Sequence, residues 1–382
     1  MHMGSRWRKL ALALLTLVAL GLVLLAALPQ GRTGVRSALF VTQVVPAIPL
    51  KVQSWVTPEP IMERKMFPTP DGDGIIDIYR PPGDGPHSAI LLFPGVAPAG
   101  EDDPRVSNLG EALARSGSVA MFYWSPVELN LRISADDVDR LVQLFKEMRQ
   151  LPYVDPDKVG MAGFSVGASI GMVAASRDEI RHDVTFFNAF GPYFDLRDLM
   201  IALSSETRFY HGETRPWQDI DWLSHEVFAL QLVESLETAE ERGLLRRRFV
   251  EDEPVEIDQG ELSPEARAAY RLLDGLSVDK AREATWQLPE SLHEKIVKVS
   301  PRYHVRRMEA RLLIMHDRED RHIPAEESRR LVDALEERGD VYYTEFSFFD
   351  HVTPGETVSP PELVVEAGKL FLHMYNILWE LR

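Results

Sequence analysis

The alternation of short apolar segments with helix-like segments constrains the fold of this chain more than any other feature of its sequence. Residues 88–93 and 119–124 are continuous apolar runs of the kind that form strands buried on both faces. Residues 135–151 follow with apolar side chains at helical spacing. The same rhythm continues through 158–175 and returns near the C-terminus, where 361–381 are helix-like. Strands that alternate with helices predict an α/β fold with a mostly parallel central sheet and helices on both faces.

This rhythm breaks in the second half of the chain. Between residues 196 and 299 helix-like segments dominate, with amphipathic patterns over 222–232 and 266–276. We therefore predict a core formed by 66–195 and 300–382, interrupted by a helical insertion over 196–299.

The N-terminal segment has the pattern of a membrane anchor. After a basic tail over 1–9, residues 10–28 form an uncharged apolar run. As a helix this run is about 28 Å long, close to the roughly 30 Å hydrocarbon core of a bilayer. We predict a single-pass membrane helix with the rest of the chain extracytoplasmic. The alternative is a cleaved signal peptide and secretion, although the run is long and lacks a good small-x-small cleavage site.

Residues 29–65 are expected to be a linker. Five prolines fall within them, and proline disrupts the interior of a helix. We therefore expect no long helix in this segment.

A five-residue motif follows the strand-like segment 158–162. Gly163, Ser165 and Gly167 match the G-x-S-x-G pattern, and helix-like residues over 166–175 come next. In a nucleophile elbow the serine lies on a sharp, strained strand-to-helix turn, which exposes its hydroxyl above the sheet. Glycine neighbours let the two backbones approach, and the helix N-terminus favours an anion forming there. We predict Ser165 as a nucleophile.

A serine nucleophile needs a histidine base, and the histidine needs a carboxylate that orients it. The chain order at such elbows is serine, acid, histidine. His351 follows the last strand-like segment, at the sheet edge where the elbow opens, and we predict it as the base. Other histidines compete for this role: His304, His316, His322 and His373. The acid is expected after the strand over 312–315, where Asp317, Glu319 and Asp320 all qualify by position.

These motifs resemble the α/β-hydrolase family, especially its dienelactone-hydrolase-like and prolyl-oligopeptidase-like branches. Those branches often carry a strand followed by H-G-x-x-D-x-x-V-P, in which the aspartate is the triad acid. This chain has His316, Asp317 in place of glycine, Asp320, Ile323 and Pro324. The resemblance implies Asp320 rather than Asp317 as the acid, and the Asp317 substitution departs from the pattern.

The resemblance covers roughly 66–195 and 300–380 and leaves the helical insertion outside it. Hydrolases of this fold commonly carry a cap at this place, so 196–299 are expected to form a lid that excludes water and shapes the substrate pocket. A dienelactone hydrolase would use a cysteine nucleophile, and this chain has no cysteine.

An oxyanion hole requires two backbone N–H donors directed at the charge that develops on the carbonyl oxygen. One is expected from Val166, directly after the nucleophile, and the other from the loop after 88–93. The His-Gly pair of the family appears in that loop as Pro94 and Gly95. This places the second donor at the N–H of Val96.

The composition excludes several classes of function. The formal net charge is −17, so nucleic-acid phosphates would repel the chain. Without cysteine it forms no disulfides, thiolate zinc sites or Cys-ligated iron–sulfur clusters. We predict no metal and no organic cofactor, and the oligomeric state stays open.

Together these features predict a membrane-anchored serine hydrolase that cleaves a small carboxylic ester or related acyl compound through an acyl-enzyme. Ser165, His351 and Asp320 would form its triad. A peptidase or acyltransferase with the same triad is the alternative, because the lid decides the acceptor. A non-catalytic binding protein on this fold is a further alternative, which loss of a triad member would favour.

Overall fold

The computed structural model describes residues 21, 27–96, 99–354 and 359–382. The apolar run 10–28, predicted to cross a membrane, lies almost entirely outside these residues. Within the part of the chain that is described, no helix is both long enough and apolar enough to span a bilayer.

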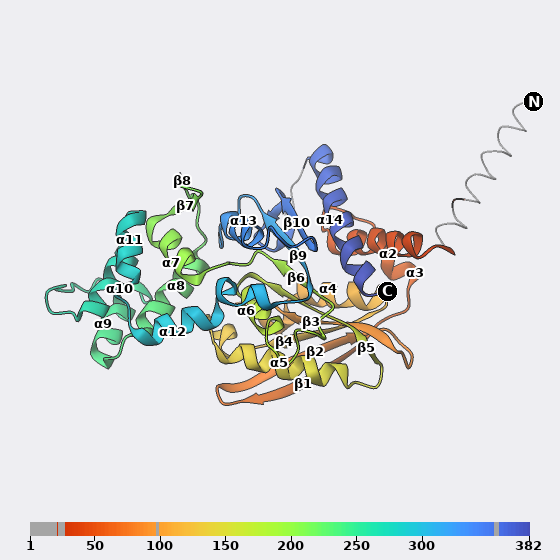
Figure 1. The fold of residues 1–382 in the computed structure, drawn as a ribbon, viewed down its shortest axis with the longest axis horizontal. Helices are drawn as coiled ribbons and strands as arrows, with labels where there is room; N and C mark the ends of the chain where they lie inside the picture. The colour runs from red at the N-terminus through yellow and green to blue at the C-terminus, as the bar shows by residue number, and fades with distance from the viewer. Residues whose placement is uncertain (1–20, 22–26, 97–98, 355–358) are drawn as a thin grey trace, which may run out of the picture.

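An eight-stranded sheet forms the centre of the molecule (Figure 1). Its strands are β1 (Ile61–Thr69), β2 (Gly72–Arg80), β3 (His87–Phe93), β4 (Ser118–Trp124), β5 (Val154–Phe164), β6 (Phe186–Phe190), β9 (Arg311–Asp317) and β10 (Val341–Phe346). They are ordered β1-β2-β4-β3-β5-β6-β9-β10, and all pairs from β4 to β10 are parallel. Strand β2 runs antiparallel to both of its neighbours, β1 and β4. The prediction of a mostly parallel sheet is confirmed.

The sheet has two apolar faces because successive side chains of a strand point in opposite directions. Ala89 and Leu91 of β3 enter one core, and Ile90 and Leu92 enter the other. The first face is covered by α5 (Asp136–Arg149) and α6 (Ser165–Ala175), with α13 (Ala325–Ala334) beside β9. The second is covered by α2 (Pro29–Val44), α4 (Pro104–Arg115) and α14 (Pro360–Glu380). Helices therefore cover both faces, as the strand–helix rhythm predicts.

The segment predicted as a linker is more ordered than its prolines suggest. Helix α2 begins at Pro29, and its side chains Phe40 and Val41 are buried in the second core. Our prediction that 29–65 contain no long helix is wrong, because a proline in the first helical turn removes only an N–H that has no intrahelical acceptor. The short α3 (Val52–Val56) follows. Strand β1 begins at Ile61, before the predicted start of the core at residue 66.

Helices fill the insertion between β6 and β9, on one side of the sheet (Figure 1). They are α7 (Leu196–Ser205), α8 (Trp222–Ser235), α9 (Ala239–Phe249), α10 (Pro264–Asp274), α11 (Val278–Thr285) and α12 (Glu290–Val299). A hairpin of β7 (Thr207–Tyr210) and β8 (Glu213–Pro216) is the only regular strand structure described there. Asp221, Thr238 and Ser263 cap the N-termini of α8, α9 and α10 with their side-chain oxygens.

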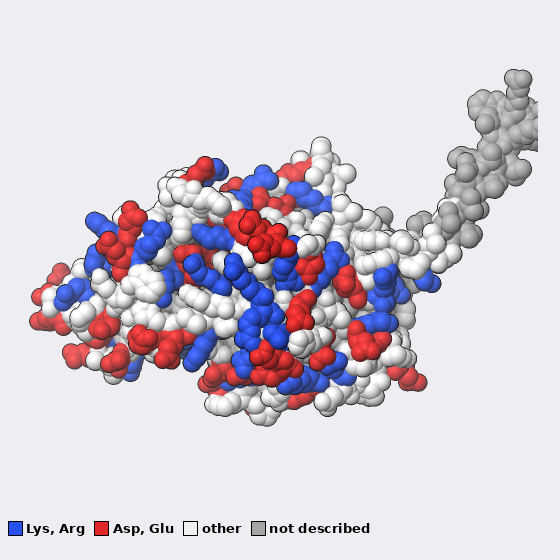
Figure 2. All heavy atoms as spheres, in the orientation of Figure 1, with Lys and Arg blue, Asp and Glu red and all other residues white. Residues whose placement is uncertain are grey.

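Acidic and basic side chains are interspersed on the face that Figure 2 shows. Many of the charges are paired, for example Arg307 with Asp178 and Arg149 with Asp183. On that face the negative net charge is therefore not gathered into one acidic field.

Candidate active site

The carboxyl ends of the parallel strands bring the predicted residues to one edge of the sheet. β5 leads into Ser165, β3 into the loop over 94–96, and β9 into the loop that holds Asp320. His351 lies in the turn between two short strands, β11 (Phe349–Asp350) and β12 (Thr353–Pro354). The loops after parallel strands are where open α/β sheets place their ligand sites.

Ser165 occupies a strained turn. It is the first residue of α6, and its φ of 53° lies in the left-handed region that non-glycine residues rarely adopt. A Cβ at Gly163 would lie 2.6 Å from the Cα of Ala168, and a Cβ at Gly167 would lie 2.4 Å from the carbonyl oxygen of Phe93. Both glycines of the motif are therefore required by close backbone contacts, as an elbow demands.

The loop after β3 lies directly against this elbow. Gly95 has a φ of 79°, and a Cβ there would be 2.5 Å from the backbone nitrogen of Gly167. Val166 lies in the first turn of α6, where helical N–H groups have no intrahelical acceptor. Val96 and Val166 both border the same cavity as Ser165.

His351 and Asp320 form a buried hydrogen-bonded pair. The Nδ1 of His351 lies 2.6 Å from the Oδ2 of Asp320, and the two side chains are 9% and 0% exposed. His351 also has a positive φ of 58°. Because Nδ1 faces the carboxylate, the other ring nitrogen of His351 is left to act at the cavity that it borders together with Ser165.

The surroundings of Asp320 keep it ionised. Its Oδ1 accepts hydrogen bonds from the backbone N–H groups of His322 at 2.7 Å and Ile323 at 3.0 Å. Its Oδ2 also lies 3.3 Å from the Nε2 of His316. Burial alone would raise the pKa of Asp320, but His351 and His316 together hold this pKa well below its usual range.

The structure distinguishes Asp320 from Asp317, the other candidate acid. Asp317 accepts backbone hydrogen bonds from Glu319 at 2.9 Å and Phe349 at 2.9 Å. Its contact with Phe349 ties the end of β9 to the segment that carries His351. Burial raises the pKa of Asp317 to about 6, and the nearby Asp320 carboxylate adds to the rise. Asp317 is therefore a tether within the site, and Asp320 is the carboxylate that contacts His351.

Three of the competing histidines have structural partners, which for His316 include the loop that holds Asp320. His316 is fully buried, with Nδ1 beside the Ser328 hydroxyl and Nε2 beside the carbonyl of Ile323. His373 is buried between Thr344 and Asn188, and burial lowers its pKa to about 3. His304 contacts the carbonyl of Val297. None of the three borders the cavity at Ser165.

Two further residues lie at this edge: His322, one of the competing histidines, and Gly191, which was not predicted from the sequence. The ring of His322 lies 4.6 Å from the ring of His351, centroid to centroid, and His322 borders the cavity. Gly191 has a φ of 62°, and a Cβ there would lie 3.0 Å from Cε1 of His351. The sequence feature that could have identified Gly191 is its position directly after β6, because the residues after the parallel strands form the site.

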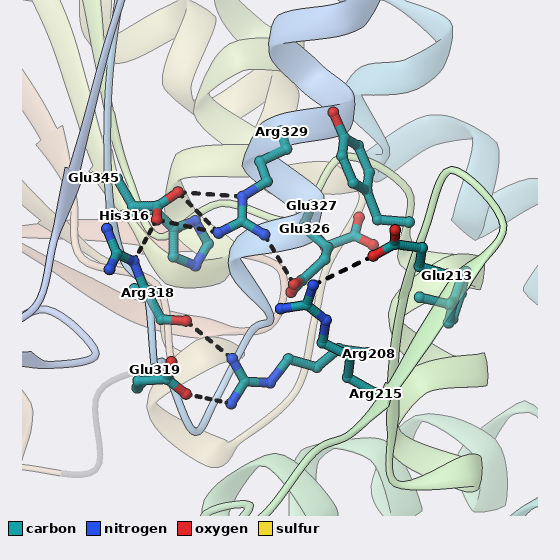
Figure 3. A network of polar contacts seen from close by, with 12 residues as sticks. Arg208, Glu213, Arg215, His316, Arg318, Glu319, Glu326, Glu327, Arg329 and Glu345 are labelled. Carbon is teal, nitrogen blue, oxygen red and sulfur yellow. Dashed lines mark hydrogen bonds and ion pairs between the residues drawn. The ribbon is translucent and has the colours of Figure 1, made fainter.

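The insertion is bound to the loop that holds Asp320 (Figure 3). Arg208 of β7 donates to the carbonyl of Arg318 at 2.9 Å and pairs with Glu319 at 2.7 Å. The indole N–H of Trp217 donates to the backbone carbonyl of Asp320 at 3.0 Å, with Trp217 buried. The N–H of Asp221 donates to the carbonyl of Arg321. The insertion therefore holds the acid loop from one side.

The cavity at Ser165 has a volume of about 840 Å³. It is bordered by side chains of the insertion, among them Leu203 of α7 and Phe228 of α8, and by residues from the second face of the sheet. Among the described residues, no group of three or more His, Asp or Glu side chains is placed to hold a metal ion.

The strand order, the antiparallel β2 and the serine at the strained turn after β5 are those of an α/β-hydrolase. The resemblance drawn from the sequence motifs is thus confirmed for the fold.

No protein-family model matches the chain, and no curated protein matches it. Similar solved structures include a putative dipeptidyl aminopeptidase IV from Bacteroides ovatus, with 14% identity and a TM-score of 0.48 over 84% of this chain and 36% of that one. Another is the acylaminoacyl peptidase of Pyrococcus horikoshii, with 13% identity and a TM-score of 0.47 over 85% and 42%. A third comes from work on two Rhizomucor miehei esterases, with 15% identity and a TM-score of 0.46 over 93% and 92%.

The chain thus spans well under half of the two peptidases and nearly all of the esterase structure. At these identities and TM-scores the matches say nothing about activity or substrate.

Proposed function

We propose that the protein is a serine hydrolase that cleaves a carboxylic ester through Ser165, His351 and Asp320. One observation carries the proposal: a serine in a strained elbow and a buried His351–Asp320 pair border the same cavity. These are the parts that an acyl-transfer site requires.

In the proposed reaction, the Ser165 hydroxyl attacks the ester carbonyl while His351 accepts its proton. Asp320 holds the imidazole in the tautomer that leaves Nε2 free as a base, and it stabilises the imidazolium. The N–H groups of Val96 and Val166 would stabilise the oxyanion. His351 then gives the proton to the leaving alcohol, and water activated by His351 releases the acid from Ser165.

The test uses the full chain in detergent with p-nitrophenyl acetate and butyrate. We expect Ser165→Ala and His351→Ala to lower kcat/KM by at least about 1,000-fold. His182→Ala serves as the matched control, because His182 is an exposed histidine outside the site. Turnover that persists in folded Ser165→Ala would reject Ser165 as the nucleophile.

A fluorophosphonate probe addresses the case in which neither ester is a substrate. Labelling of the wild type and none of Ser165→Ala would identify an activated serine. Folded wild type that is neither labelled nor active would favour the non-catalytic alternative. Peptide anilides and added alcohol acceptors in the same assay would distinguish a peptidase and an acyltransferase from an esterase.

Membrane attachment is a separate proposal, supported by the uncharged apolar run 10–28 and the basic residues before it. Fractionation of cells that express the full chain tests it. We expect the protein in the membrane pellet after alkaline extraction, and recovery of a shortened chain from the medium would support cleavage and secretion instead.

A further inference from the structure

The cavity at Ser165 extends far beyond the space that an ester bond needs. From the elbow it continues between the second face of the sheet and helices α2, α4 and α14. Its lining there includes Ile90 and Leu92 of β3 and Leu370, Met374 and Ile377 of α14. These residues are at most 5% exposed, so this part of the cavity, here called the inner chamber, is lined by side chains of the second core.

The inner chamber is lined mainly by hydrocarbon. Most polar side chains on its wall have partners: the Gln43 amide N–H donates to Oδ1 of Asn108 at 2.8 Å, and Oδ1 of Asn188 lies 2.8 Å from Nε2 of His373, whereas Oε1 of Gln43 is buried without a hydrogen-bond partner. Lys51 donates to a backbone carbonyl at 2.9 Å. Water gains little in a site with so few open polar partners, whereas an aliphatic chain gains by leaving water.

The order of events in the proposed reaction decides which half of the ester belongs in the chamber. The alcohol must leave and be replaced by water while the acyl group stays bonded to Ser165. A chamber lined by buried apolar side chains suits the acyl half, because that half stays bonded to the enzyme during both steps. The leaving alcohol is then assigned to the part of the cavity beside α7 and α8, bordered by Leu203 and Ser224.

We propose, on the basis of the function above, that the substrate is an ester of a long unbranched fatty acid, and that its acyl chain lies in the inner chamber between the sheet and α14. The whole cavity, which holds the inner chamber and the part beside α7 and α8, has a volume of about 840 Å³, in the upper part of the range for sites that enclose a complete organic ligand. The acyl chain enters past Ser165, where the carbonyl stops beside Val96 and Val166.

The proposal predicts a dependence on acyl length. Burying a methylene is worth about 0.8 kcal/mol, which is about 4-fold in kcat/KM per carbon until the chamber is full. Wild-type kcat/KM for p-nitrophenyl esters should therefore rise steeply from C2 and reach its maximum at C10 or longer. Alkyl acetates, in which the alcohol is varied instead, should show little dependence on length.

Two substitutions fill the chamber from the side of α14. Met374→Trp and Ile377→Trp each add an indole to its wall. We expect turnover of C12 and C16 esters to fall at least about 100-fold, while C2 and C4 esters keep their rates within about 3-fold. Leu372→Trp is the matched control, since Leu372 lies on the same helix, is 54% exposed and does not border the cavity.

Labelling of Ser165 by a short fluorophosphonate separates the outcomes. If the wild type is labelled and hydrolyses C2 and C4 esters with no gain at C8 to C16, the inner chamber does not hold an acyl chain and only this proposal fails. Effects of Met374→Trp on alkyl acetates rather than on acyl esters would overturn the assignment of the acyl half. Absence of labelling and of all turnover would instead reject the proposed function. A tryptophan variant whose Ser165 is not labelled by the short fluorophosphonate is treated as misfolded. The other tryptophan variant then takes its place in the test.

Long acyl chains occur both in dispersed esters and in membrane lipids. Presenting C16 esters in detergent micelles and in phosphatidylcholine vesicles distinguishes these sources. Faster turnover in vesicles by the full chain would indicate a bilayer source, and equal rates would indicate a dispersed one.

Discussion

Replacement of Gly191 by alanine tests whether the backbone directly after β6 positions His351. The added Cβ would lie 3.0 Å from Cε1 and 3.2 Å from Nδ1 of the His351 ring. Ordinary carbon contacts are about 3.5–4.0 Å, so the ring must retreat by about 0.5 Å. A misplacement of about 1 Å can cost about 100-fold in rate, so we expect kcat/KM on a p-nitrophenyl ester to fall about 10-fold in Gly191→Ala.

The same substitution also has a backbone cost, which a second glycine measures separately. Gly212 has a φ of 81°, and a Cβ there would meet no atom within 4 Å. Alanine in the left-handed region costs about 1–2 kcal/mol at either position. Urea unfolding should show similar losses of stability in Gly191→Ala and Gly212→Ala, with activity lost only in the first. Activity within two-fold of the wild type in Gly191→Ala, or equal losses in both variants, would refute the reasoning.

Asp320→Asn should lower kcat roughly 10⁴-fold, because His351 loses the carboxylate that orients it. Asp317→Asn should keep kcat within about 10-fold of the wild type. Steady-state kinetics of the two variants tests both expectations. The folded-state pKa of Asp317, about 6, lies above the unfolded value of about 3.9. Its protonated form therefore stabilises the fold below about pH 4, and this contribution is lost as the pH rises through 6. Urea unfolding should show Asp317→Asn gaining stability relative to the wild type between pH 4 and 7. A variant whose stability falls relative to the wild type as the pH rises would contradict this. Trp217→Phe removes the hydrogen bond to the carbonyl of Asp320 and should cost about 1 kcal/mol of unfolding free energy; no loss in thermal or urea unfolding would show that this bond does not hold the acid loop.

Local patterns made much of the fold predictable. The apolar runs and helical spacings read from the sequence correspond to β3, β4, α5, α8 and α10 within a few residues. Each of these elements buries one face or both, so the spacing of apolar residues in the sequence follows which side chains are buried. The exceptions have local causes as well. Helix α2 was missed because Pro29 stands at the one place in a helix where proline is tolerated, and β1 was missed because its burial pattern, mostly exposed, gives no apolar run.

The site was predictable where its chemistry follows from order along the chain. The elbow around Ser165 and the position of His351 after the last strand were found in this way. Chain order could not choose between Asp317 at the end of β9 and Asp320 in the loop after it, which are three residues apart. The choice depends on which carboxylate faces His351, and that is set by the path of a turn whose backbone N–H groups bind both aspartates.

The sequence by itself determined the alternation that builds the sheet and the strand–elbow–helix order around Ser165, because both are patterns of residues close in the chain. Only the tertiary structure decided the contact of Gly191 with His351, the hold of Trp217 on the Asp320 loop, and the chamber beneath Ser165. Each joins segments separated by about a hundred residues or more. The chamber is shaped by α2, α4 and α14, whose apolar faces, read one at a time, are indistinguishable from ordinary core. Whether such faces pack tightly or leave a cavity depends on the distance between the helices and the sheet. No local sequence pattern determines that distance.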